Sequence, residues 1–76
     1  MYNILVTSNS INKMYYNINN VDKCYSLIVD TYKAFKLCND NTFSIVLHDK
    51  ERIVIRINNK HCITRDSIHN KYLIYN

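Results

Sequence analysis

The pattern of apolar and polar residues is clearest in the middle of the chain, where it changes from one period to another. Over residues 21–39, apolar side chains recur every three or four positions between polar ones. This spacing places the apolar residues on one side of an α-helix. Asn20 can cap its first turn, Asp22 suits the positive end of the helix dipole, and Asn39 can end the helix in place of glycine. The sequence therefore predicts a helix over about residues 20–38.

Residues 42–59 alternate with a period of two, which is typical of strands with one buried face. Two such runs, joined at the segment HDKE, predict a β-hairpin over 42–58. The register that turns the isoleucines inward places Leu47 opposite Ile53 and leaves residues 49–51 as the loop. In that register the outer face carries the cross-strand pairs His48–Arg52, Val46–Val54, Ser44–Arg56 and Thr42–Asn58.

Outside the helix and the hairpin, the pattern of some segments fits more than one kind of secondary structure. Residues 2–7 predict a strand and 60–64 a further strand. Residues 9–20 fit either an irregular loop or a short helix, which would align Ile11, Met14, Tyr15 and Ile18. Residues 64–76 favour a helix that aligns Ile68, Tyr72 and Tyr75, with a final strand at KYLIY as the alternative. One helix packed on a mostly antiparallel sheet is an α+β fold, and a chain of this length, 1–76, predicts a single domain.

Glycine and proline are both absent from the 76 residues, and this absence excludes several kinds of site. A P-loop, a dinucleotide-binding fingerprint and a nucleophile elbow each need glycine for a tight turn or for close approach of the backbone. Turns must instead use asparagine and aspartate, which tolerate the left-handed conformation better than most residues. We expect such turns at the segments CNDN, HDKE and NNK.

Cysteine content, hydropathy and charge limit the cellular environment and the kinds of partner that we expect. Three cysteines without paired spacing are expected to be free thiols, as in a reducing cytoplasm. No apolar run approaches the roughly 20 residues that span a bilayer, and no signal peptide is visible, so we expect a cytoplasmic protein without a membrane partner. The formal net charge of +4 permits an anionic partner without requiring one.

Candidate catalytic and metal-binding residues are few. The three histidines follow no known spacing of metal ligands, and Glu51 is the only glutamate. A zinc site needs about four converging ligands, and acid–base catalysis often uses paired carboxylates. We therefore expect no metal, no cofactor and no enzymatic activity.

The outer face of the predicted hairpin is the first candidate binding surface. It carries Arg52 and Arg56, with His48 and Asn58 beside them. Arginine can bind phosphate or carboxylate through two parallel hydrogen bonds. A polar outer face is also what an antiparallel sheet covered on one side presents to water. Both interpretations stay open from the sequence.

The adjacent tyrosines Tyr15 and Tyr16 are the second candidate. Two neighbouring side chains on a strand or helix do not both point inward, so we expect one of them to be exposed. Exposed tyrosine is typical of protein-recognition surfaces and of platforms on which nucleic-acid bases stack. The alternative is partial packing against the edge of the sheet.

The first functional hypothesis is a stand-alone binding protein that inhibits a host protein by covering it. Asparagine, isoleucine, lysine and tyrosine, whose codons are AT-rich, supply about half of the residues and indicate an AT-rich genome, such as that of a low-GC bacterium, its phage or some viruses. The hypothesis takes a phage or a mobile element as the source. The small size and the lack of assembled catalytic residues resemble the profile of small inhibitors of bacterial defence nucleases, including anti-CRISPR proteins. That resemblance implies a host partner, for example a nucleic-acid-processing complex. A homodimer through an exposed edge strand is also open.

Two further hypotheses remain. A small nucleic-acid-binding regulator would use the face of the 42–58 hairpin, and its affinity would fall steeply with salt. The order of elements also loosely resembles that of the toxin ribonucleases of bacterial toxin–antitoxin pairs. This resemblance implies metal-independent RNA cleavage by basic and aromatic side chains, but it rests on the fold alone and on no motif.

Overall fold

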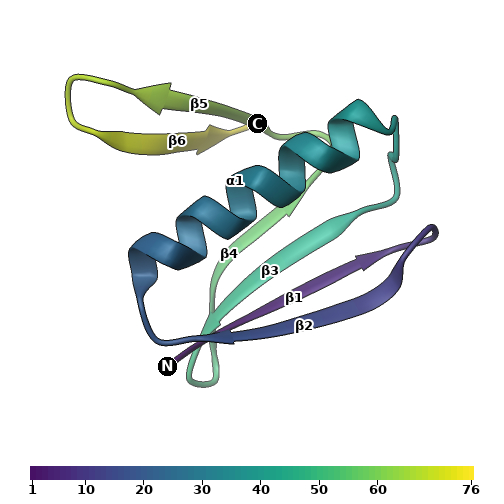
Figure 1. Cartoon of the computed structure of the whole chain (residues 1–76), viewed down its shortest axis with the longest axis horizontal. Coiled ribbons are helices and arrows are strands. Elements are labelled where there is room, and N and C mark those ends of the chain that lie inside the picture. Colours follow the sequence, from purple (N-terminus) through teal and green to yellow (C-terminus); the bar gives the residue numbers. More distant parts are fainter.

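Three β-hairpins and one helix make up the chain, in a computed structural model that describes residues 1–76. Strands β1, β2, β3 and β4 form one antiparallel sheet in the order β2-β1-β3-β4, and β5 pairs with β6 in a separate two-stranded sheet. Figure 1 shows α1 crossing one face of the larger sheet, with the β5–β6 hairpin on the other side of α1 from β1 and β2. The predicted α+β class is confirmed. The elements are β1 (Tyr2–Ser8), β2 (Asn12–Ile18), α1 (Val21–Leu37), β3 (Ser44–Asp49), β4 (Arg52–Asn58), β5 (Cys62–Asp66) and β6 (Lys71–Tyr75).

Helix α1 begins and ends where its sequence predicts. The Asn20 side-chain oxygen accepts hydrogen bonds from the backbone N–H groups of Asp22 and Lys23, at 2.9 and 3.2 Å. These bonds satisfy two of the donors that a helix leaves free in its first turn. At the other end Asn39 adopts a φ of 55°, the left-handed conformation that stops a helix.

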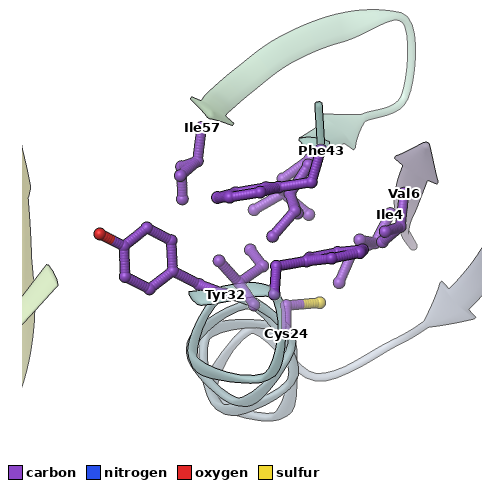
Figure 2. Close-up of a cluster of buried hydrophobic side chains, with 10 residues drawn as sticks. Ile4, Val6, Cys24, Tyr32, Phe43 and Ile57 are labelled. Carbon is purple, nitrogen blue, oxygen red and sulfur yellow. The ribbon is translucent and has the colours of Figure 1, made fainter. Parts of the chain in front are cut away.

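The buried side of α1 packs on the inward-facing residues of the sheet. Phe43 joins the two layers, since its ring stacks on Phe35 at a centroid distance of 4.8 Å and meets Tyr32 edge-on at 5.7 Å. Figure 2 shows the rings of Phe43 and Tyr32 in the core cluster, with the Tyr32 hydroxyl at its margin. Strands β1, β3 and β4 supply the apolar side chains opposite the helix. The core cluster is Ile4, Val6, Cys24, Ile28, Tyr32, Phe35, Phe43, Ile45, Leu47 and Ile57.

The segment 9–20, predicted as a short helix or a loop, is instead mainly strand β2, and both predictions were wrong. Met14, Tyr16 and Ile18 alternate with a period of two and lie opposite Val6, Ile4 and Tyr2. The sequence was ambiguous because Tyr15 and Tyr16 are both aromatic. Tyr15 completes a helical spacing with Met14 and Ile18, whereas Tyr16 completes an alternating one.

A cluster of hydrogen bonds closes the β1–β2 turn without glycine. The Ser8 hydroxyl oxygen accepts from the backbone N–H groups of Ser10 and Ile11. Asp40, in the loop after α1, accepts from the hydroxyls of Ser10 and Thr42 at 2.5 and 2.6 Å. These hydrogen bonds hold the pKa of Asp40 at about 2, below its ordinary value of 3.8. The carboxylate thereby joins the β1–β2 turn to the α1–β3 loop.

The 42–58 hairpin is confirmed, but its predicted register was wrong. Leu47 pairs with Ile55 rather than with Ile53, and the turn contains only Lys50 and Glu51. The register shifts between Leu47 and His48, so that Val54 is left without a partner in β3. This β-bulge shifts the alternation of β4 by one residue. Ile55 and Ile57 therefore point toward the helix, whereas Ile53, on the other side of the bulge, points to the opposite face.

The C-terminal segment forms strands rather than the favoured helix. KYLIY, the alternative, is β6, and the strand predicted at 60–64 is β5, shifted toward the C-terminus. Turns occur at CNDN, HDKE and NNK as predicted. The left-handed positions are Asn12, Asn39, Lys50 and Asn70. Asparagine therefore takes the place of glycine at every such position except that of Lys50.

Candidate functional site

The larger sheet has one face that no other element covers. Helix α1 packs on the side of the sheet that carries Ile4 and Leu47. In each strand, the residues that alternate with these inward-facing positions point to the opposite side. The middle row of this open sheet face runs across all four strands as Tyr15, Leu5, Val46 and Arg56. Tyr15 is 60% exposed, whereas Val46 is only 8% exposed. The open sheet face therefore has an apolar centre with a projecting aromatic ring at one side and an arginine at the other.

The charges on the open sheet face are all of one sign. Lys13 follows the alternation of Tyr15 on β2, and Arg56 lies on β4. Apart from Lys13, the pairing rows on either side of the middle row contain only neutral polar residues, the ionisable His48 and the apolar Ile53. The carboxylates lie on α1, in turns, on β5 or on the helix side of β3, at Asp22, Asp30, Asp40, Asp49, Glu51 and Asp66. No carboxylate side chain lies on the open sheet face.

Four of the six residues predicted as contacts share the open sheet face, namely Tyr15, His48, Arg56 and Asn58. Tyr16 does not, because it lies opposite Ile4 and packs against the core. Arg52 does not, because the bulge at Val54 pairs it with Asp49 on the helix side of the sheet. The hairpin's outer face is therefore not a ribbon with two arginines, and the tyrosine pair is divided between two environments.

A second surface lies between the first half of α1 and the β5–β6 hairpin. The cross-strand pairs Ile63–Ile74 and Arg65–Tyr72 share one face of this hairpin. Ile63 and Ile74 pack against the core cluster. Arg65 and Tyr72 line a cavity of about 570 Å³ together with Tyr25 of α1 and with Asp22, Ser26, Asn70 and Lys71. The cavity is mostly polar and carries two cations.

A shallower depression continues this cavity toward β4. It has a volume of about 460 Å³ and shares Tyr25 and Tyr72 with the first cavity. Its remaining lining includes Arg56, His61 and Tyr75. The two depressions adjoin at Tyr25 and Tyr72, and we call them together the hairpin groove. It has tyrosines at its centre and cations at both ends.

The hairpin groove was not predicted from the sequence, because the pattern of residues 64–76 favoured a helix. A helix would have placed Arg65 and Tyr72 two turns, or about 10 Å, apart along its axis, whereas strand pairing makes them direct neighbours. The guanidinium carbon of Arg65 lies 5.3 Å from the centre of the Tyr72 ring, and its Nη2 donates to the Asn70 side-chain oxygen. The one available signal was the pair of basic and aromatic residues on either side of the polar segment DSIHN.

The histidines and cysteines do not gather in one cluster. His61 contacts Asn58 in the β4–β5 turn, and the Nδ1 atom of His69 lies 2.6 Å from a carboxylate oxygen of Asp66. That contact lowers the pKa of Asp66. All three cysteines are free thiols, and burial raises the pKa of Cys24. The structure contains no group of three or more His, Cys, Asp or Glu side chains that could hold a metal ion.

The chain was compared with family models, with curated proteins and with solved structures, and no match was found in any of the three comparisons. No helix of the structure is long and apolar enough to cross a membrane. The open sheet face and the hairpin groove are therefore the two candidate functional surfaces of the protein.

Proposed function

We propose that the protein is a small, non-enzymatic binding protein that covers an acidic patch on a partner protein with its open sheet face. One observation carries the proposal: this face combines an apolar centre with cations and has no carboxylate. A sheet face that served only as a wet surface would usually mix charges of both signs with polar residues.

Tyr15 supplies most of the apolar contact area for such an interaction. It projects from β2 beside the half-buried Leu5, so a partner would desolvate the aromatic ring and the exposed part of Leu5, whereas Val46 is already buried. Large, rigid side chains of this kind carry much of the binding energy in protein interfaces. The cations Lys13 and Arg56 have no carboxylate partner within the protein and add complementarity to negative charge.

Self-association through the same face is disfavoured by these charges. A two-fold dimer pairs one surface with itself, so it would bring Lys13 and Arg56 of two copies together without any carboxylate between them. A homodimer through an edge strand is a separate prediction, and the charges of this face do not bear on it.

Inhibition of a host protein by occlusion is the biological role that we propose for this contact. The abundance of amino acids with AT-rich codons supports an AT-rich genome, and a phage, mobile-element or viral origin is part of this proposal. A rigid sheet with a single helix behind it needs no catalytic group to block access to a larger protein. We propose a host defence protein, such as a nuclease complex, as the partner. The alternative use of the hairpin face to bind nucleic acid is weakened, because Arg52 and Arg56 lie on opposite sides of the sheet.

The proposal is tested by affinity capture with a matched pair of double variants. The tagged protein, K13A/Y15A and R65A/Y72A would each be incubated with lysates of low-GC bacteria. Each double variant loses one cation and one tyrosine, from the open sheet face or from the hairpin groove. We expect a host protein that is retained by the wild type and by R65A/Y72A but is lost by K13A/Y15A.

The captured protein would then be purified, and its affinity measured at two salt concentrations. Retention of the same protein by K13A/Y15A would place its contact elsewhere on the molecule and would overturn the proposal. Capture of no specific protein from any lysate would also count against it.

A further inference from the structure

We infer that the hairpin groove, between α1 and the β5–β6 hairpin, is a binding site for single-stranded nucleic acid. This inference concerns a different class of partner from the proposed function, and a surface that shares only Arg56 with the open sheet face. It rests on the tyrosines that the two adjoining depressions share and on the cations that line their far ends.

The tyrosines provide stacking surfaces inside a recess. Tyr25 of α1 and Tyr72 of β6 line both parts of the groove, and Tyr75 lines the part nearer β4. None of these rings belongs to the core cluster, so the hydrophobic core does not require them. An aromatic ring can stack with any base, because every base has a flat π-face.

The cations are placed where a phosphate backbone could follow the tyrosines. Arg65 and Lys71 line one end of the groove and Arg56 the other. The only carboxylate side chain in the lining is that of Asp22, so cations outnumber carboxylates along the groove. Arg65 is held beside Tyr72 by the ring contact and by its hydrogen bond to Asn70. The guanidinium therefore lies over one face of the Tyr72 ring, so a base would stack on the guanidinium plane or on the opposite face of the ring.

A single strand fits these features better than a duplex or an acidic peptide. In a duplex the bases are stacked on one another and do not reach rings that lie in a recess. An acidic peptide would use the cations but would gain little from tyrosines. Unpaired nucleotides use both, through stacking of the bases and through contacts of the phosphates.

The experiment is a titration of fluorescently labelled oligonucleotides, read by anisotropy, with the wild type and its variants. The probes are single-stranded DNA and RNA of about 12 nucleotides, within the usual range of small single-strand sites, and a duplex of the same sequence. We expect both single strands to bind at low salt and the duplex to bind more weakly. Three phosphate contacts predict that log K falls with log salt at a slope of about −2. Comparison of the DNA and RNA probes would reveal which backbone is preferred.

Variants then locate the site. Replacement of Tyr72 by alanine should weaken binding by about fivefold or more, whereas Tyr72→Phe should retain it because the ring remains. Arg65→Ala should reduce the salt slope to about −1.4. The control K13A/Y15A, which removes a cation and a tyrosine from the open sheet face, should bind like the wild type.

Several results would overturn the inference. They are the absence of binding to either single strand at low salt, equal loss in K13A/Y15A and in R65A/Y72A, and equal loss in Tyr72→Ala and Tyr72→Phe. A thermal unfolding curve for each variant would show that lost binding is not lost folding. Loss of host-protein capture with intact oligonucleotide binding, or the reverse, would separate this inference from the proposed function.

Discussion

The body of the molecule, made of α1 and the four-stranded sheet, differs from the β5–β6 hairpin in how each is stabilised. All 13 buried residues lie between Ile4 and Ile57, and the last two strands contribute none. An isolated two-stranded hairpin is at best marginally stable in water. The hairpin therefore depends on its attachment to the body, whereas the body has a hydrophobic core of its own.

The attachment consists of few contacts. The Tyr32 hydroxyl donates to the backbone oxygen of His61, and the Lys36 ammonium donates to that of Asn59 at 2.7 Å. Ile63 and Ile74 add apolar contacts against the core. Elements with little burial open locally at a lower free energy than the core does. We therefore expect the β5–β6 hairpin to open locally more readily than the core does.

The largest effect should separate the two regions directly. Ile28 is fully buried, so Ile28→Ala should lower the free energy of unfolding by about 2–5 kcal/mol. Ile74→Ala removes the same atoms from a half-buried site in the hairpin and should lower it by much less. Urea denaturation of both variants measures the difference. Equal losses would mean that the hairpin belongs to the same cooperative unit as the core.

A smaller effect should come from the contact that joins the two regions. Tyr32→Phe keeps the ring in the core and removes only the hydrogen bond to His61, which should cost about 1 kcal/mol. Hydrogen exchange, residue by residue, should become faster in 62–75 and change little in β1 and β3. Uniform acceleration throughout the chain would contradict the independent opening of the hairpin.

The smallest effect should be a dependence of the body's stability on acid. The pKa of Asp40 is lowered from 3.8 to about 2 by the hydroxyls of Ser10 and Thr42, so the carboxylate stabilises the fold above pH 3.8. This contribution is lost as the pH falls through about 2. Thermal midpoints measured between about pH 4 and pH 2 should therefore fall less in Asp40→Asn than in the wild type. An identical fall would assign the acid sensitivity to other groups, such as Asp66 in the hairpin, whose pKa is also lowered.

The same contrast explains which parts of the fold could be predicted. The helix was readable because five buried residues share one side of it and Asn20 marks its beginning. Strand β2 was not, because it lies at the edge of the sheet and buries too little to impose one period. The C-terminal strands failed for a similar reason, since Tyr72 fits both a helical and an alternating pattern.

The binding surfaces were predicted in part. Alternation alone was enough to place His48 and Asn58 on an outer face of β3 and β4. The position of Arg52 depended on the bulge, and the alternating residues of β4 do not reveal which of them is left unpaired. The hairpin groove was hidden because it joins α1 to strands that are distant from it in the sequence.

The bulge at Val54 also bears on how the protein avoids aggregation. Strand β4 has the sequence RIVIRIN and lies at the edge of the sheet, where its outer backbone groups are free to pair with another chain. A regular, isoleucine-rich edge of this kind is a template for cross-β association. The unpaired residue bends the strand and interrupts its regular run of hydrogen-bonding groups. One extra residue thereby lets an apolar strand remain at an open edge with less risk that two copies will join through it.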